Sequence, residues 1–147
     1  MYKKILIATD GSPLSKKAVT NGLALAESLG SEVVIVRVVG RYMSSYFEGG
    51  YVLPSEDVDR IEKQWSDEAQ ASLDVMKKLA IRIGIPAKTL VVRSNSVADA
   101  IMSTATKNKC HLIVMSSHGR RGIKGILLGS ETQHVLTHSK IPVLVLR

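Results

Sequence analysis

The sequence predicts an α/β protein built on a doubly wound, five-stranded parallel sheet with helices on both faces. Three observations lead to this prediction. Short β-branched runs alternate with longer segments whose apolar residues recur at helical spacing. The short runs are almost entirely apolar, as strands buried on both faces are. The order β-α-β-α-β-α-β-α-β is the one that builds a parallel sheet through helical crossovers.

Five apolar runs are the expected strands. Each is short and rich in Val, Ile and Leu, which suit the buried, pleated surface of a sheet. The longest helical segment lies between the second and the third run. In chain order the expected strands are residues 4–9, 33–39, 89–92, 112–115 and 141–146.

Capping residues mark the boundaries of the first two helices. Ser12 before Pro13 is typical of an N-cap followed by proline at the first helical position, and Gly30 is a natural stop. The second helix is expected over Ser55–Ile83, with Gly84 ending it. Its buried stripe is expected to comprise Val58, Ile61, Trp65, Ala69, Leu73, Met76, Ala80 and Ile83.

The third and fourth helices begin at the spacing of a capping box. Ser96 is followed three residues later by Asp99, and Ser130 is followed by Gln133. In such a box the first side chain accepts a hydrogen bond from an amide of its own first turn, so both serines are expected to cap their helices. The hydroxyl of Ser130 could also bond a phosphate.

Composition narrows the class of protein. With 147 residues, 45% of them hydrophobic, residues 1–147 have the size of a single domain. No apolar run is long enough for a membrane span or a signal peptide, so we expect a cytoplasmic protein. The single cysteine, Cys110, excludes an internal disulfide and a cysteine metal cluster. The formal charge of +7 favours anionic partners, but the absence of a recognition motif argues against nucleic-acid binding.

The segment from Met115 to Ser130 is the most informative for function. It leaves a buried strand, crosses a loop with glycines and basic residues, and enters a helix. Glycines let the backbone approach a phosphate closely, and a helix N-terminus offers free N–H groups. A plain strand-to-helix connection would give the same pattern. The sequence lacks a Walker A string and a dinucleotide fingerprint, which argues against a P-loop NTPase or an NAD-dependent enzyme.

The pattern Ser116-x2-Gly119-x9-Gly129-Ser130 resembles the Gly-x2-Gly-x9-Gly-(Ser/Thr) motif of the universal stress protein family, on its ATP-binding branch. The similarity covers the whole chain, from the opening Lys-Ile-Leu-Ile-Ala-Thr-Asp-Gly-Ser to the closing Pro-Val-Leu-Val. The sequence departs from the motif where Ser116 replaces the first glycine. The resemblance implies strand order 3-2-1-4-5 and a homodimer paired through the last strand, Ile141 to Leu146.

The resemblance also implies roles for individual residues. Asp10 would face the ribose or a Mg²⁺ ion bound through the phosphates, and the main chain of Val38 would meet the adenine. Met115 and Ser116 would lie by the ribose, and Arg120 would pair with phosphate oxygens or remain a solvated charge. The expected nucleotide-binding residues are Ala8, Thr9, Asp10, Val38, Met115, Ser116, Gly119, Arg120, Gly129, Ser130, Glu131 and Thr132.

The leading prediction is a stress-response protein that binds ATP in a regulatory or protective role. No catalytic residue is assigned, and slow ATP hydrolysis stays compatible with the sequence. Ser116 leaves a second prediction open, a nucleotide-free interaction module in which this residue closes the site. If the position needs a positive φ, serine costs about 1 kcal/mol relative to glycine; if the glycine serves close approach, the serine side chain would clash with the ribose or donate to it. His134 and His138 have the spacing of a metal pair but lack an evident third ligand, so we expect a solvated helix face.

The loop from Gly40 to Pro54 is long for a compact domain and holds four of the six aromatic residues. Aromatic side chains are unfavourable when all are exposed to water. We therefore expect this loop to fold over the nucleotide or against a partner subunit, the alternative being local packing on the long helix.

Overall fold

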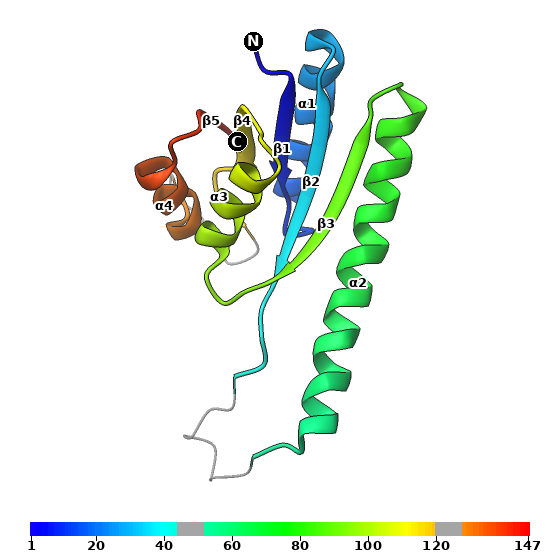
Figure 1. Cartoon of the computed structure of the whole chain (residues 1–147), viewed down its shortest axis with the longest axis vertical. Helices are drawn as coiled ribbons and strands as arrows, with labels where there is room; N and C mark the ends of the chain where they lie inside the picture. Colours follow the sequence, from blue (N-terminus) through cyan, green and yellow to red (C-terminus); the bar gives the residue numbers. More distant parts are fainter. Residues whose placement is uncertain (44–51, 120–127) are drawn as a thin grey trace.

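The computed structural model describes residues 1–43, 52–119 and 128–147. Within these residues five strands and four helices alternate along the chain (Figure 1). In chain order they are β1 Lys4–Ala8, α1 Pro13–Leu29, β2 Glu32–Val39, α2 Ser55–Arg82, β3 Ala87–Arg93, α3 Val97–Lys107, β4 Leu112–Ser116, α4 Ser130–His138 and β5 Val143–Leu146.

Within the described residues the strands form one parallel sheet in the order β3-β2-β1-β4-β5. This arrangement confirms the predicted fold class and the strand order implied by the resemblance. The central strand is β1, where Ile7 lies opposite Ile35 of β2 and Val114 of β4. Because the strands are parallel, their carboxyl ends meet at one edge of the sheet, and β1 and β2 run downward toward it in Figure 1.

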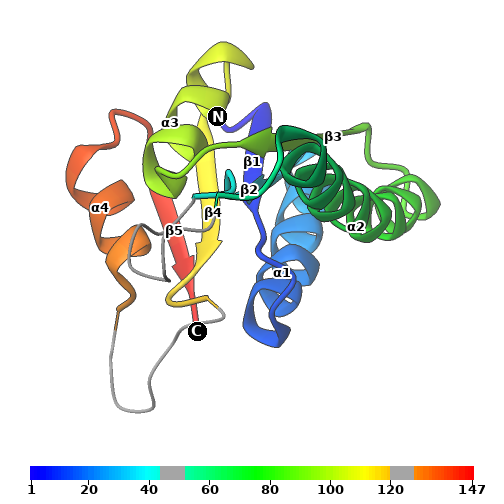
Figure 2. The ribbon, with the colours of Figure 1, turned by 90° about the horizontal axis from the view of Figure 1, so that it is seen from below.

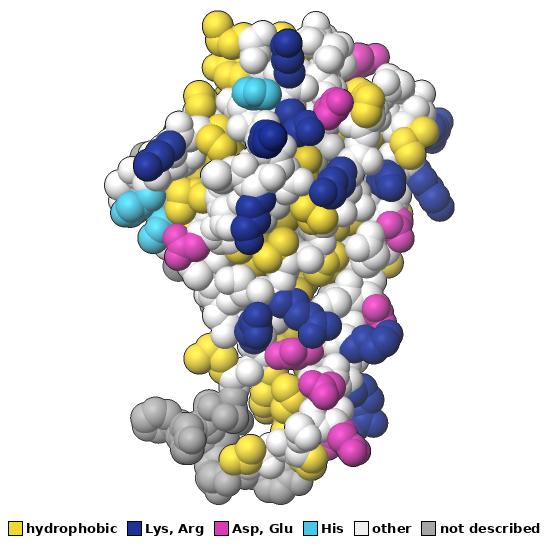
Figure 3. All heavy atoms as spheres, viewed as in Figure 1, with side chains coloured by type: hydrophobic (Ala, Val, Ile, Leu, Met, Phe, Trp, Pro, Cys, Tyr) yellow, Lys and Arg dark blue, Asp and Glu magenta, His cyan; other side chains and the backbone are white. Residues whose placement is uncertain are grey.

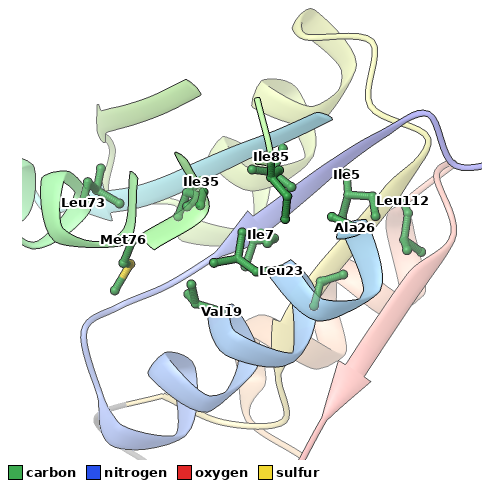
Figure 4. Close-up of a cluster of buried hydrophobic side chains, with 13 residues drawn as sticks. Ile5, Ile7, Val19, Leu23, Ala26, Ile35, Leu73, Met76, Ile85 and Leu112 are labelled. Carbon is green, nitrogen blue, oxygen red and sulfur yellow. The ribbon is translucent and has the colours of Figure 1, made fainter. Parts of the chain in front are cut away.

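Helices cover both faces of the sheet, with α1 and α2 on one face and α3 and α4 on the other (Figure 2). Side chains alternate between the faces along each strand, so Ile5 and Ile7 pack toward α1 and α2 while Leu6 packs toward α3 and α4. Figure 4 shows the first of these two cores. Its buried members are Ile5, Ile7, Val19, Leu23, Ala26, Val33, Ile35, Leu73, Met76, Ala80, Ile85, Leu112 and Val114.

The predicted boundaries of α1 are confirmed. The Ser12 hydroxyl accepts a hydrogen bond from the Ser15 N–H at 3.2 Å, and Pro13 opens the helix. Gly30 ends it with φ of 62°, a left-handed conformation that glycine adopts without a side-chain penalty.

The buried stripe predicted along α2 is correct only from Ala69 to Ala80. Ala69, Leu73, Met76 and Ala80 are buried, whereas the side chain of Trp65 is 38% exposed. Val58 and Ile61 are half-buried, and Ile83 is exposed. The reason is length: the 28 residues of α2 span about 42 Å, while the eight residues of β2 span about 26 Å. The first turns of α2 therefore extend past the carboxyl edge of the sheet (Figure 1).

Polar contacts hold this overhanging part of α2. The Glu62 carboxylate accepts the Tyr42 N–H at 2.9 Å and pairs with the Arg93 guanidinium at 3.4 Å. Arg93 also donates to the Ser66 hydroxyl at 3.0 Å. The helix is thus tied to the ends of β2 and β3 by charge and hydrogen bonding where apolar burial is incomplete.

Charge is unevenly distributed over the surface. Seven of the 13 acidic residues belong to α2. Figure 3 shows Asp and Glu interspersed with Lys and Arg along the lower part of this helix, and further Lys and Arg spread over the viewed face without forming a continuous stripe. Among the described residues, no helix is long and apolar enough to cross a membrane.

Candidate functional site

The candidate site lies at the carboxyl edge of the sheet, between β1 and β4. The chain leaves β1 toward β2 on one side, and it later returns through α3 to β4 on the other side. This is the switch point of the strand order, where open parallel α/β sheets bind ligands. The predicted site residues come from the ends of β1, β2 and β4 and from the start of α4.

The turn after β1 is fixed by its own hydroxyl and carboxylate groups. The buried Thr9 hydroxyl lies 3.0 Å from the Ser15 hydroxyl and accepts the Gly11 N–H at 3.2 Å. The Asp10 Oδ1 accepts the Ser12 N–H at 2.9 Å. These contacts hold the half-buried Asp10 carboxylate at the carboxyl end of β1. Ala8, just before them, is the last residue of β1 and is buried.

Val38 contributes main-chain groups beyond the end of β1. The Val36 carbonyl accepts the Thr9 N–H at 3.0 Å, and the Val39 carbonyl accepts the Ser94 N–H at 2.9 Å on the β3 side. Main-chain groups of alternate residues in a strand face the same neighbour. Val38 therefore directs its N–H and C=O toward the side of β1, two residues beyond the last β1–β2 pair.

Ser116 occupies its position without backbone strain. Among the described residues other than glycine, only Lys109 has a positive φ, and Ser116 is the last residue of β4. Its hydroxyl donates to the His118 carbonyl at 2.9 Å. The strain that serine would suffer at a positive φ thus does not arise at this motif position. The neighbouring Met115 is 5% exposed and packs into the α3–α4 core, so toward the crevice it offers its main chain.

Two motif glycines permit close approaches between loop segments. A β-carbon at Gly119 would overlap the Oδ2 of Asp10, which places these residues against each other across the crevice. A β-carbon at Gly129 would lie 3.2 Å from Cα of His118. The Gly129 N–H donates to the Ser117 carbonyl at 2.7 Å, so this amide serves the protein's own fold.

The start of α4 differs from the expected capping box. Gly129 is the N-cap, Ser130 is the first helical residue, and no side chain of the described residues caps the helix. The first helical hydrogen bond joins the Gln133 N–H to the Gly129 carbonyl at 2.9 Å. By helix geometry, the amides of residues 130–132 have no partner within α4 and point out of its first turn. Ser130 is exposed there, so its hydroxyl is available to a ligand rather than used as a cap.

Glu131 and Thr132 both use their side chains in contacts with other elements, Glu131 at an exposed position and Thr132 at a buried one. The Thr132 hydroxyl is buried and donates to the Ser116 carbonyl at 2.9 Å. The Glu131 carboxylate accepts the Ala98 N–H of α3 at 2.8 Å. What both residues have left for a ligand is their first-turn main-chain amides, which have no partner within α4. Local spacing gave no sign of the Glu131 contact, because its partner lies 33 residues away.

The capping box expected at Ser96 is also absent. Its hydroxyl donates to the Asp99 carboxylate at 2.5 Å instead of accepting an amide of α3. The His134 Nε2 lies 3.5 Å from the Asp99 Oδ1, and the rings of His134 and His138 stack with centroids 4.3 Å apart. The described residues contain no group of three or more side chains that could hold a metal ion.

Two predicted features fall outside the described residues. They are Arg120, with the rest of residues 120–127, and residues 44–51 of the loop from Gly40 to Pro54. Of that loop, Tyr42 is described, half-buried, and bonded through its N–H to Glu62. Arg41 donates its N–H to the Asn95 side chain at 2.7 Å, a contact between the ends of β2 and β3 that spacing did not indicate.

The structure is that of a parallel α/β domain with an acidic turn after β1 and the N-terminus of α4 near the switch point of its sheet. The chain belongs to the universal stress protein family, whose sequence model matches residues 1–147. It is 35% identical to universal stress protein MJ0531 of Methanocaldococcus jannaschii, covering 100% of this chain and 83% of that protein. It is 32% identical to universal stress protein YxiE of Bacillus subtilis over the full length of both.

Solved structures show the same fold. Protein MJ0577 of Methanocaldococcus jannaschii superposes with a TM-score of 0.84 at 29% identity, covering 99% of this chain and 96% of that one. A universal stress protein solved in complex with cAMP superposes with a TM-score of 0.71 at 24% identity, covering 99% and 97%. At this lower identity the likeness concerns the fold.

Proposed function

We propose that residues 1–147 act as one nucleotide-binding domain that holds ATP, or a related adenine nucleotide, in a regulatory or stress-protective role. The observation that carries the proposal is a continuous run of contacts across the crevice. Asp10 meets Gly119, the adjacent His118 meets Gly129, and Gly129 opens α4. An acidic turn, a close backbone approach and the first-turn amides of α4 thus occur in one run of contacts, which supports the proposal.

The chemistry of these groups fits a nucleoside phosphate. First-turn amides and the positive end of the α4 dipole attract phosphate oxygens. The Ser130 hydroxyl adds a donor at the same turn, and the main chain of Val38 offers a donor and an acceptor to a base edge. Ser116 has no positive φ, so backbone strain gives no reason to prefer a nucleotide-free interaction module, and the titration below tests whether its side chain closes the site.

The Asp10 carboxylate suits either a ribose hydroxyl or a magnesium ion carried by the phosphates. Carboxylates bind Mg²⁺ together with substrate phosphates and water rather than in a cage made only of protein ligands. Such an ion would also neutralise charge between Asp10 and the phosphates. We therefore include Mg²⁺ in the proposal as a companion of the nucleotide.

We also propose a homodimer through Ile141 to Leu146. The Pro142 carbonyl accepts the Ile113 N–H of β4 at 2.9 Å, and the Leu146 carbonyl accepts the N–H of Ser117, just after β4, at 2.8 Å. By alternation, Val143 and Val145 turn their main-chain groups to the outer edge of β5. An apolar edge strand with such groups exposed favours pairing with another strand, and a second copy supplies one.

The test is calorimetric titration of the purified protein with ATP, ADP and cAMP, each with and without Mg²⁺ and up to millimolar concentration. GTP is the control for the base, and chromatography of the small molecules released from gently purified protein identifies any retained ligand. Saturable binding of an adenine nucleotide supports the proposal. Absence of heat together with absence of retained nucleotide contradicts it and leaves the nucleotide-free module.

A further inference from the structure

Glu131 joins the first turn of α4 to the N-terminus of α3. Its carboxylate accepts the Ala98 N–H at 2.8 Å. Ala98 is the second residue of α3, so its amide is one of the four that a helix leaves without an internal partner. A carboxylate at this place forms a charge-assisted hydrogen bond and also interacts favourably with the helix dipole.

The sequence of α3 does not supply this cap itself. Ser96 stands at the N-cap position, but its hydroxyl donates to the Asp99 carboxylate and caps no amide of the helix. The acceptor for Ala98 therefore comes from α4. The two helices lie side by side on the same face of the sheet (Figure 2).

The hydrogen bond to Ala98 also determines where the negative charge of Glu131 lies. The main-chain amide of Glu131 belongs to the turn that faces the crevice, where a free carboxylate would repel phosphate. Bonding to α3 takes the carboxylate away from that turn. The next residue, Thr132, donates its hydroxyl to the Ser116 carbonyl at 2.9 Å, so consecutive residues fix the turn to α3 and to β4.

We propose that Glu131 is a positioning residue for the nucleotide site: by capping α3 it orients the first turn of α4 and keeps its own charge away from the phosphates. This inference rests on the proposed function. It assigns the side chain of Glu131 no contact with the nucleotide. On this proposal, the N-terminus of α3 helps to hold the first turn of α4 in position.

The test compares Glu131→Val, which removes the acceptor, with Glu131→Gln, which keeps an acceptor oxygen and removes the charge. Gln133→Val is the matched control, since it places the same side chain at an exposed position of the same helix. Hydrogen exchange of the Ala98 amide reports the cap, and calorimetry with ATP reports the site. Circular dichroism establishes that each variant is folded.

We expect Glu131→Val to speed exchange of the Ala98 amide and to weaken ATP binding about fivefold, equal to about 1 kcal/mol, a typical value for a lost cap. Glu131→Gln should restore most of both properties, and Gln133→Val should change neither. Unchanged Ala98 exchange in Glu131→Val would overturn the inference. Tighter ATP binding by either Glu131 variant would also overturn it, because the carboxylate would then face the phosphates. If the wild-type protein does not bind ATP, the proposed function is refuted, and the positioning role with it. The exchange rate of the Ala98 amide would then still show whether Glu131 caps α3.

Discussion

Replacing Ser130 by proline removes the first amide donor of α4 while preserving the helix that carries it. Proline is favoured at the first helical position, where its fixed φ suits the helix and its missing N–H is not needed for helical bonds. The preceding Gly129 has φ of −72° and ψ of 156°, a conformation that residues before proline adopt readily. The chain already uses this arrangement at α1, where Ser12 with ψ of 158° precedes Pro13.

The expected loss of affinity follows from the two donors at Ser130. Ser130→Ala removes only the hydroxyl, and Ser130→Pro removes both the hydroxyl and the amide. A hydrogen bond to a charged group is worth about 1.5–3 kcal/mol, or about 10- to 150-fold in affinity. Proline should therefore weaken ATP binding by this factor beyond the alanine variant. The free energy of unfolding should change by only about 0.5 kcal/mol, as is usual for exposed substitutions.

Calorimetric titration with MgATP measures the affinity of the wild-type protein and of both variants, and urea denaturation measures their stability. A folded Ser130→Pro variant that binds ATP as tightly as Ser130→Ala would refute the reasoning. The amide at the start of α4 would then not contact phosphate, and the run of contacts from Asp10 to α4 would not be evidence for a phosphate site.

Three further predictions concern the edge strand, the thiol and the core. Val145→Pro removes a main-chain donor from the outer edge of β5, so light scattering should show monomers, whereas Val145→Thr should still dimerise; a dimeric proline variant would contradict pairing through this edge. Burial raises the pKa of the Cys110 thiol and the nearby Lys4 partly opposes this, so iodoacetamide should modify native protein more slowly than urea-unfolded protein near pH 8. Because the folded protein holds the thiol pKa above its unfolded value, the contribution of the neutral thiol to stability is complete below the unfolded pKa and declines as the pH rises through the folded pKa. Denaturation at pH 8–10, compared with Cys110→Ala, would detect this decline. Leu73→Ala should lower the free energy of unfolding by about 2–5 kcal/mol, because this side chain is fully buried between α2 and the sheet; a loss below about 1 kcal/mol would mean that the core closes around the gap.

Sequence reasoning was most successful where structure depends on neighbours in the chain. Ser12 and Gly30 delimit α1 as predicted, because capping bonds and left-handed conformations are local requirements. The parallel sheet was also predictable from local sequence, because a strand that is buried on both faces is apolar at nearly every position. The strand order came from the resemblance to the family, because the pattern of strands alone does not fix which of them are adjacent.

Sequence reasoning failed where distant segments compete for the same group. Ser96 and Ser130 both have capping-box spacing, yet neither caps its helix. At α3 the amide of Ala98 receives the carboxylate of Glu131, and α4 begins one residue earlier than expected, at the close packing of Gly129 on His118. These outcomes depend on how α3, α4 and β4 meet in space, which local spacing does not encode.

The incomplete burial of α2 has an evolutionary consequence. Its first turns are held by Glu62 and Arg93, whereas its later turns carry the apolar contacts of the core. An insertion or deletion near the start of α2 therefore disturbs few apolar contacts, and lengthening a surface connection adds little closure entropy. Relatives can thus vary in length at this end of the helix, and acquire new binding surfaces there, while the sheet and the crevice stay the same.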